Sequence, residues 1–137
     1  MVLLLTTSLV ACNTVSPPKN MSPEKTIEYY FKQFNNRNAA AMQSVSVEEL
    51  GNMQSTFRTL VYVKVIYCKE ESDSTIVRKY FSKEWYPGAS DIALVHVAYE
   101  ICTLDGFVLD TEIRGGDYYL VKDNSNDYWR IVAHGIA

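Results

Sequence analysis

Residues 22–34 read Ser-Pro-Glu-Lys-Thr-Ile-Glu-Tyr-Tyr-Phe-Lys-Gln-Phe, and this stretch predicts the first helix of the fold. Ser22 can cap a helix, Pro23 suits its first position, and Glu24 favours the positive end of the helix dipole. Four apolar side chains recur at the spacing of one helical face: Ile27, Tyr30, Phe31 and Phe34. The polar run at 35–38 is expected to end this helix.

Two further helical segments are expected before the first strand. Ala39 to Val45 suits a short helix with Met42 and Val45 as its buried positions. A third helical turn is expected over residues 47–50, because the Gly and Asn at 51–52 then stop it. The N-terminal part of the domain is therefore expected to be helical.

The hydrophobic period then changes to two, which is typical of β-strands. Residues 57–69 are rich in Val, Ile and Tyr, and they predict the first strand. Alternation divides this strand into two faces. One face is expected to hold Val61, Val63, Val65 and Tyr67, and the other Tyr62, Lys64, Ile66 and Cys68.

Three more strands are expected after a segment at 73–85 whose pattern suits either a short helix or a strand. Residues 91–103 form the second long strand, and Tyr118–Lys122 with Tyr128–His134 form a hairpin. Residues 104–116 contain three of the six glycines and several charges, so they are expected to be a loop or an irregular edge.

Helices followed by a run of antiparallel strands predict an α+β fold, with the helices packed on one face of a curved sheet. The 137 residues fit one domain, which is expected over residues 22–137. The net charge of −3 and the lack of a basic cluster argue against a nucleic-acid partner, since such binding depends on neutralising phosphates.

The start of the chain resembles the signal peptide of bacterial lipoproteins. Residues 2–11 are mostly apolar but too short to span a bilayer, and Leu9-Val10-Ala11-Cys12 resembles the lipobox. The resemblance implies that residues 1–11 are removed and that Cys12 carries the lipid. Residues 12–21 then form a flexible tether, and the protein faces outward from the cell membrane. The alternative is a buried strand that happens to end in a cysteine.

The folded part resembles the nuclear transport factor 2-like superfamily, which has a cone-shaped, cystatin-like fold. The residues that carry the resemblance are Tyr29-Tyr30-Phe31, Asn35-Asn36-Arg37-Asn38 and the terminal run Tyr128-Trp129-Arg130-Ile131-Val132 before Gly135. The pattern is also similar to small uncharacterised lipoproteins of Gram-positive bacteria. This superfamily hosts enzymes, binders and scaffolds, so the resemblance implies the fold more than the function.

Isomerases and cyclases of this superfamily place an Asp or His base and Tyr donors inside the cone. By that resemblance, Tyr30, Tyr99 and Tyr118 are candidates to line a pocket, with His134 or Asp117 as a base. No position matches a named active-site motif, so no catalytic residue is assigned.

No cofactor and no metal site is predicted, because the sequence lacks HxH, HxxxH and CxxC motifs. His96 and Glu100 are four residues apart, about 13 Å along a strand, so they cannot bind one ion together.

Cys68 and Cys102 lie at the ends of the two long predicted strands. If these strands are antiparallel neighbours, the cysteines are about 25–30 Å apart. A disulfide needs Cα atoms within about 7 Å, so two free buried thiols are expected unless the strands are strongly staggered or parallel.

Trp129 is expected to seal the core. Trp85 is expected either to cap the cone or to anchor a partner.

Three functions remain open. The first is non-catalytic binding of a small apolar ligand in the cone, or of a protein partner at the cell envelope. The second is a structural or assembly role with dimerisation through the open sheet face, and the third is an isomerase- or cyclase-like enzyme. A cavity lined by Tyr and apolar residues favours ligand binding or catalysis. A cone filled by aromatic side chains favours a structural role: Phe31, Phe34, Tyr99 and Trp129 are the residues concerned.

Overall fold

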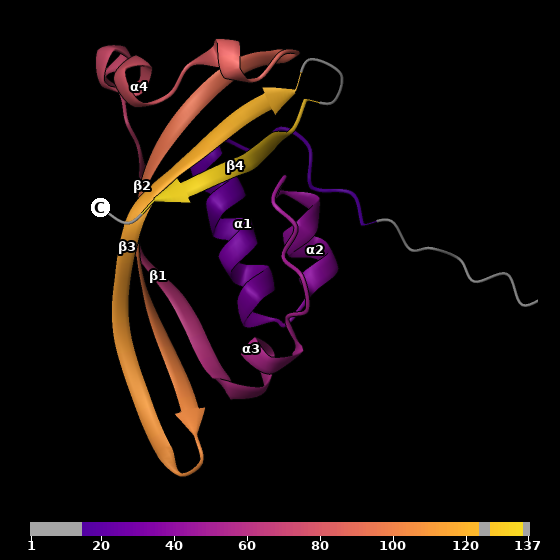
Figure 1. Cartoon of the computed structure of the whole chain (residues 1–137), viewed down its shortest axis with the longest axis vertical. Helices are drawn as coiled ribbons and strands as arrows, with labels where there is room; N and C mark the ends of the chain where they lie inside the picture. Colours follow the sequence, from indigo (N-terminus) through magenta and orange to yellow (C-terminus); the bar gives the residue numbers. More distant parts are fainter. Residues whose placement is uncertain (1–14, 124–126, 136–137) are drawn as a thin grey trace, which may run out of the picture.

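A curved, open sheet of four antiparallel strands, with helices on its concave face, forms the domain (Figure 1). The computed structural model describes residues 15–123 and 127–135, so the predicted signal peptide and Cys12 lie outside the described residues. The strand order is β1-β2-β3-β4, with β1 (Leu60–Glu70), β2 (Ala89–Asp105), β3 (Val108–Asp123) and β4 (Trp129–Gly135). The expectation of an α+β fold with an antiparallel sheet is confirmed.

Helix α1 (Pro23–Asn35) begins where the sequence predicts. The side chain of Ser22 accepts a hydrogen bond from the N–H of Lys25 at 3.1 Å, which satisfies one of the free donors of the first turn. Ile27 and Phe31 are buried against the sheet, and Tyr30 and Phe34 are partly buried beside them. The predicted apolar face is therefore the face that packs on the strands.

The side chains of α1 also cover the free edge of β1. The N–H of Val63 donates to Oδ1 of Asn35, and the N–H of Glu70 donates to Oε1 of Glu24, both at 2.9 Å. The guanidinium of Arg37 binds the carbonyl oxygens at the start of β1. Unpaired backbone groups at a strand edge can pair with another chain. These contacts cover such groups on the outer edge of β1.

Helix α2 (Ala39–Ser44) is confirmed, and Met42 and Val45 are buried as expected. The helical turn predicted at 47–50 is wrong, because this segment bends and has no regular structure, and its start bonds to β4. Ser46 forms a parallel bridge with Ile131, and the N–H of Val47 donates to the carbonyl of Ile131 at 2.8 Å. The backbone groups at the outer edge of β4 are thereby hydrogen-bonded, which a helical segment at 47–50 would not allow.

The third helix lies later than predicted, as α3 (Gln54–Thr59), so β1 starts at Leu60 rather than Phe57. The helical turn brings the ring of Phe57 to 6.2 Å from that of Phe34. The predicted faces of β1 hold only in part. An irregularity between Val65 and Tyr67 shifts the register, so Cys68 packs on the core and Tyr67 is half exposed.

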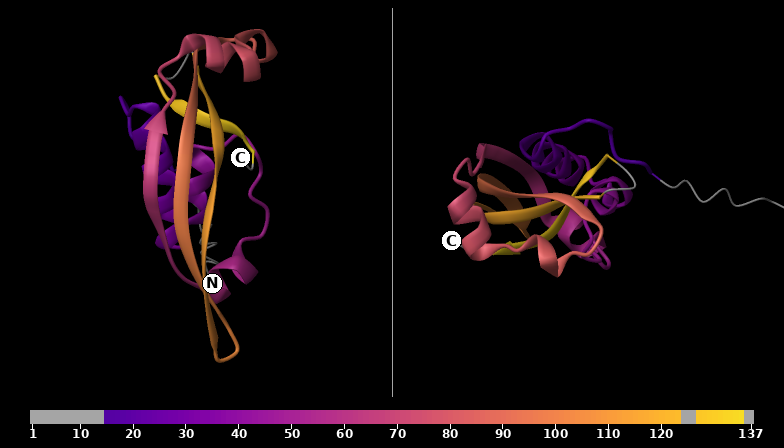
Figure 2. Two further views of the ribbon diagram at one scale, coloured as in Figure 1. Left: turned by 90° about the vertical axis from the view of Figure 1, so that its left-hand side faces the viewer. Right: turned by 90° about the horizontal axis from the view of Figure 1, so that it is seen from above.

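The loop predicted at 104–116 is also wrong: β2 and β3 form one long hairpin, whose far end extends beyond the helices (Figures 1 and 2). Asp105 pairs with Val108, so the loop has two residues, and only Gly106 has a positive φ, at 61°. A positive φ at the first loop residue is the geometry of a type II′ hairpin turn. Eight consecutive residues of β3, Val108 to Gly115, are exposed, which explains the absence of a hydrophobic pattern there.

Two cores lie on opposite faces of the sheet. The larger contains Ile27 and Phe31 of α1 with Tyr118 and Leu120 of β3, and Trp129 packs at its margin as predicted. The smaller contains Phe81, Val121 and Val132. Since Leu120 and Val121 are neighbours in a strand, their side chains point to opposite faces.

The segment at 73–85, whose pattern suits either a helix or a strand, is helical. It forms α4 (Ser74–Tyr80) and the short 3-10 helix η1 (Lys83–Trp85), which bring Phe81 against the second face of the sheet. Tyr86 packs on Phe81, with ring centres 5.4 Å apart, whereas the side chain of Trp85 is 66% exposed.

Both described cysteines are free thiols, as the sequence predicts. Cys102 lies opposite Tyr62 and Cys68 lies opposite Val97, so the two are at different ends of the β1–β2 ladder. Cys102 is buried, while Cys68 is half-buried, and burial raises the pKa of its thiol to about 11.

Candidate functional site

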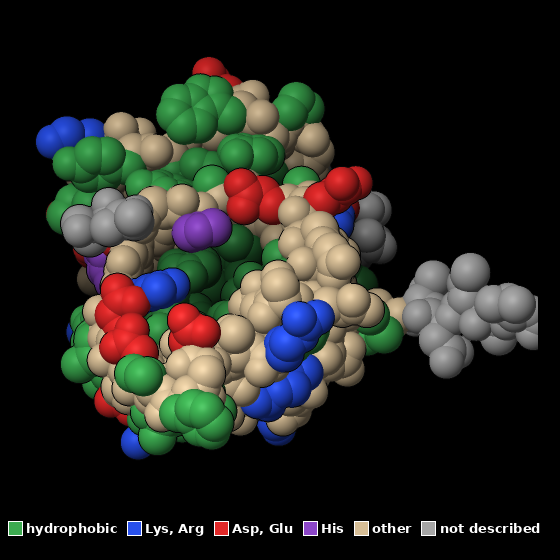
Figure 3. Space-filling view, turned by 60° about the horizontal axis from the view of Figure 1, so that its bottom comes forward, with side chains coloured by type: hydrophobic (Ala, Val, Ile, Leu, Met, Phe, Trp, Pro, Cys, Tyr) green, Lys and Arg blue, Asp and Glu red, His purple; other side chains and the backbone are tan. Residues whose placement is uncertain are grey.

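A cleft of about 690 Å³ opens beside β3, where β4 ends and the long hairpin continues alone. This volume is within the range of small-molecule sites. Figure 3 shows a hollow floored by hydrophobic side chains, with a histidine and charged side chains at its rim. Three of the four predicted pocket residues line the cleft: Tyr99, Tyr118 and His134.

Tyr99 of β2 and Tyr118 of β3 line the inner side of this cleft, and Tyr30 of α1 lies close to both. The ring of Phe31 lies 4.6 Å from that of Tyr99 and 5.9 Å from that of Tyr118, so one buried helix residue supports both. Tyr30, the fourth predicted residue, does not line the cleft. Its phenol interacts electrostatically with both Tyr99 and Tyr118. The aromatic cluster fills part of the cone and leaves a cleft at its open side.

The buried phenols of this cluster are held in their protonated form. Burial, followed by the neighbouring Tyr99 and Glu48, raises the pKa of Tyr30 to about 12. Burial is also the largest cause of the raised pKa of Tyr118, followed by Tyr99 and Tyr30. At neutral pH these hydroxyl groups are therefore hydrogen-bond donors rather than anions.

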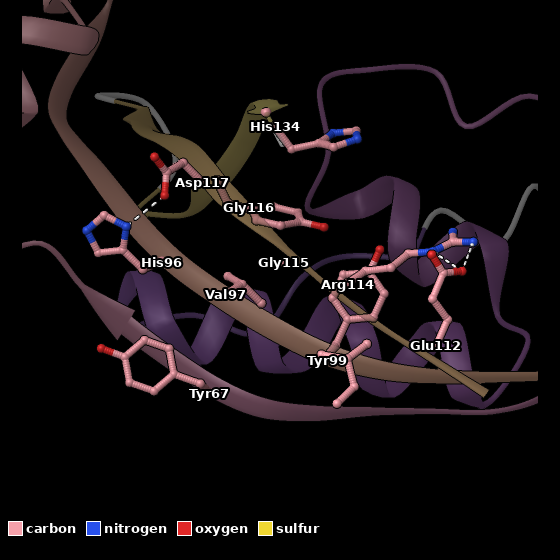
Figure 4. Close-up of a pocket in the computed structure, with 13 residues that line it drawn as sticks. Tyr67, His96, Val97, Tyr99, Glu112, Arg114, Gly115, Gly116, Asp117 and His134 are labelled. Atoms are coloured by element: carbon pink, nitrogen blue, oxygen red, sulfur yellow. Dashed lines mark hydrogen bonds and ion pairs between the residues drawn. The ribbon is translucent and has the colours of Figure 1, made fainter. Parts of the chain in front are cut away.

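A charged pair stands on the β3 side of the cleft. Nη2 and Nε of Arg114 donate to Oε2 of Glu112 at 2.8 Å and 3.0 Å (Figure 4). The two residues are two positions apart in β3, so they share one face. Arg114 lies opposite Tyr99 in the β2–β3 ladder, and a hydrogen bond with the Tyr99 side chain contributes to its raised pKa, after the larger contribution of Glu112.

His134 completes the rim from β4. It lies opposite Tyr118 in the ladder, and the two rings stack at 5.5 Å with an interplanar angle of 18°. Its Nδ1 is 3.7 Å from Oε2 of Glu48, which is too long for a hydrogen bond. The side chain of His134 is more than half exposed, so it is available to a ligand.

Asp117, the other candidate base, also lines the cleft together with His96, and the two are bound to each other. Oδ1 of Asp117 is 2.7 Å from Nδ1 of His96, and Nε2 of His96 is 2.9 Å from Oε2 of Glu71 (Figure 4 shows the first contact). Asp117 and Tyr118 are consecutive in β3, so their side chains point to opposite faces. Asp117 therefore does not face the tyrosine cluster.

The sequence patterns do not predict this cluster of Glu71, His96 and Asp117. A signal was present in Asp105-Gly106, because a two-residue hairpin loop at this point fixes the register of the strands on either side. Counting back from the loop without a bulge places His96 opposite Asp117. Glu71 has no such signal, since it comes from the turn after β1.

Neither a metal centre nor a membrane-spanning helix is seen in the part of the chain that the structure describes. In residues 15–123 and 127–135, no three His, Cys, Asp or Glu side chains are grouped so that they could hold a metal ion. No helix within these ranges has the length and hydrophobicity needed to cross a bilayer.

A protein-family model described as Domain of unknown function (DUF4829) matches residues 24–135, which include all four strands of the sheet and the cleft. No curated protein and no solved structure matches the chain. Because the matched span covers most of the 137 residues, the chain belongs to the DUF4829 family.

Proposed function

We propose that this protein is an exported, lipid-anchored binding protein that holds a small ligand in the cleft beside β3 without transforming it. The observation that carries the proposal is the convergence of Tyr99, Tyr118, Arg114 and His134 on one cleft with a largely apolar lining. Ligand sites typically combine an apolar wall with a few placed polar groups.

The polar groups define the kind of ligand. Protonated tyrosines donate hydrogen bonds, and Arg114 has donors left over after its pairing with Glu112. The negative charge of Glu112 offsets the positive charge of Arg114, so the cleft offers a strongly charged anion little electrostatic attraction. The ligand that fits is a small molecule with an apolar body and one end rich in hydrogen-bond acceptors.

The arrangement favours binding over catalysis. A base must lie within hydrogen-bond reach of the group that orients it, but His134 is 3.7 Å from Glu48. His96 and Asp117 also line the cleft, but both ring nitrogens of His96 are engaged, with Asp117 at 2.7 Å and with Glu71 at 2.9 Å, so neither is left to accept a proton from a ligand. Tyr118 is buried and protonated, and its hydroxyl is thus suited to fixing the orientation of a ligand.

The location is part of the proposal and depends on the N-terminal sequence. Cys12 follows an apolar run and a lipobox-like Leu-Val-Ala, and the residues from Asn13 to Asn20 suit a mobile tether. The fold assignment to the nuclear transport factor 2-like superfamily is likewise proposed. It is supported by the helices on the concave face of a curved antiparallel sheet.

A titration with 6-propionyl-2-(dimethylamino)naphthalene, a neutral apolar fluorophore with a ketone acceptor at one end, tests the cleft. We expect binding to the native protein, and roughly 3–10-fold weaker binding to Tyr118→Phe, because a hydrogen bond to the ketone is lost. Tyr62→Phe is the matched control, since that hydroxyl donates to Glu100 at 2.5 Å and is not part of the cleft. Equal affinity of the two variants would contradict the proposed site.

A further inference from the structure

The long hairpin leaves one edge of the sheet without a partner. β4 pairs with β3 only from Asp117 onward, so the described part of β3 from Val108 to Gly116 has no strand on that side. The outer edge of β1 is bound by side chains of α1, and β4 is bridged by Ser46. A long exposed edge without such cover is a template for pairing with another chain.

We propose that a second copy of this chain pairs antiparallel with this edge, around a two-fold axis at Ile113. Each copy then contributes the same segment, as a symmetric dimer requires. The central contact is Ile113 against Ile113 of the other copy, and this side chain is 67% exposed in the isolated chain. The pairing goes beyond the proposed ligand binding and does not depend on it.

The charges along the edge select this register. With the axis at Ile113, Glu112 of each copy lies directly opposite Arg114 of the other, which gives two attractive cross-strand pairs. An axis at Asp110, Glu112 or Arg114 places two like charges opposite each other. An axis at Thr111 places Asp110 opposite Glu112, which is also repulsive. Of the registers centred on residues 110–114, only the one at Ile113 is free of like-charged pairs.

This register also extends the cleft. Glu112 and Arg114 line the cleft on its β3 side. In the dimer, Glu112 and Arg114 of the other copy lie next to them, at the side of the cleft that is open in the isolated chain. Beyond Asp110 the hairpin must leave the edge, because β4 of the other copy occupies it from Asp117 onward. The apolar tip of the hairpin then lies next to that copy instead of in water: its exposed side chains are Leu104, Phe107, Val108 and Leu109.

The charge of the hairpin argues against a lipid surface as the occupant. Its far end carries three carboxylates, Asp105, Asp110 and Glu112, and a single cation, Arg114. Membranes with anionic lipids attract basic segments and repel acidic ones. The alternating Glu112 and Arg114 are better matched by the same two residues of a second copy.

Disulfide trapping of the full-length chain, purified in detergent, tests the register. Directly opposite residues have Cα atoms about 4.5–5.5 Å apart, so Ile113→Cys is expected to form a reducible dimer under mild oxidation. Leu109→Cys is the matched control, because four residues from the axis on each copy separate these cysteines by roughly 26 Å. Its partner across the β2–β3 ladder is Leu104, so no cysteine of the same chain lies opposite it. The parent chain controls for its own cysteines, of which Cys68 and Cys102 are free in the structure.

Charge reversal in the Ile113→Cys background adds a second readout. Glu112→Arg places like charges opposite each other, and we expect roughly tenfold less cross-linking. Adding Arg114→Glu reverses both members of each pair and should restore the dimer. The dimer is ruled out if Ile113→Cys gives no cross-link, if Leu109→Cys cross-links equally, or if charge reversal has no effect. None of these readouts uses a ligand, so they leave the proposed binding function to its own test.

Discussion

The Nδ1 atom of His96 lies 2.7 Å from Oδ1 of Asp117, its direct partner across the β2–β3 ladder. The other ring nitrogen lies 2.9 Å from Oε2 of Glu71. Glu71 directly follows β1, so this imidazole connects the end of β1 to the two central strands. The hydrogen bonds with Glu71 and then Asp117 raise the pKa of His96.

We expect this contact to make stability depend on pH. A group whose pKa is higher in the folded state contributes stability that is fully present below its unfolded pKa, about 6.5 for His. The contribution is lost as the pH rises through the raised pKa of folded His96. The midpoint of thermal unfolding, measured from about pH 5 to pH 9, should therefore fall over this window in the native chain. His96→Asn should remove this fall, and an identical profile in the variant would contradict the assignment.

The aromatic support under the cleft predicts a large loss of stability. Phe31 is 3% exposed and contacts both Tyr99 and Tyr118, so Phe31→Ala should lower the free energy of unfolding by about 3–5 kcal/mol. Phe107→Ala is the matched control, because this ring is fully exposed and its removal should change stability by at most about 0.5 kcal/mol. Urea unfolding of both variants in dilute solution checks the contrast, and similar losses would be inconsistent with the described core.

The hydrogen bond from the Val63 N–H to Asn35, at the outer edge of β1, predicts a smaller loss of stability. Asn35→Ala leaves the N–H of Val63 without its partner and should cost about 1–3 kcal/mol in the free energy of unfolding. Asn36→Ala, in the same turn but exposed, should change stability much less. Hydrogen exchange at the Val63 amide provides a local readout. Unchanged protection in Asn35→Ala would show that another group covers this edge.

The predicted lipid anchor is tested by fractionation. Cys12→Ala should move the protein from the membrane fraction to a soluble or unprocessed form and abolish incorporation of a labelled fatty acid, because the sulfur that accepts the lipid is gone. Cys68→Ala, which removes a half-buried thiol from the domain, should leave both properties unchanged. Membrane association of Cys12→Ala equal to that of the native chain would contradict lipidation at this residue.

The elements predicted well from the sequence are those defined by local signals. The Ser22 cap and the spacing from Ile27 to Phe34 suffice for α1, since both act within a few residues. The irregularities in β1 depend on pairing with a distant strand, so alternation alone placed Tyr67 and Cys68 on the wrong faces. The far part of β3 faces no core and therefore lacks the alternation that marks a strand.

The residues of the candidate site also divide into those that the sequence predicts and those whose place depends on strand pairing. Tyr99, Tyr118 and His134 were predictable as cleft residues because the resemblance implies tyrosines and an Asp or His base inside a cone. Arg114 and Glu112 are not predicted as cleft residues, since they lie in the segment whose composition predicts a loop. Their place in the cleft depends on the β2–β3 register, which is set by a turn several residues away.

The most direct measurement of the central claim is the thermal shift of residues 20–137 against a panel of metabolites, lipids and envelope fragments. A ligand at 100 times its dissociation constant adds about 2.7 kcal/mol, which is several degrees for a domain of this size. We predict that compounds with an apolar body and an acceptor-rich end stabilise the native protein and Tyr62→Phe, but stabilise Tyr118→Phe much less. No stabilisation by any such compound, or equal stabilisation of both variants, would contradict ligand binding in the cleft beside β3.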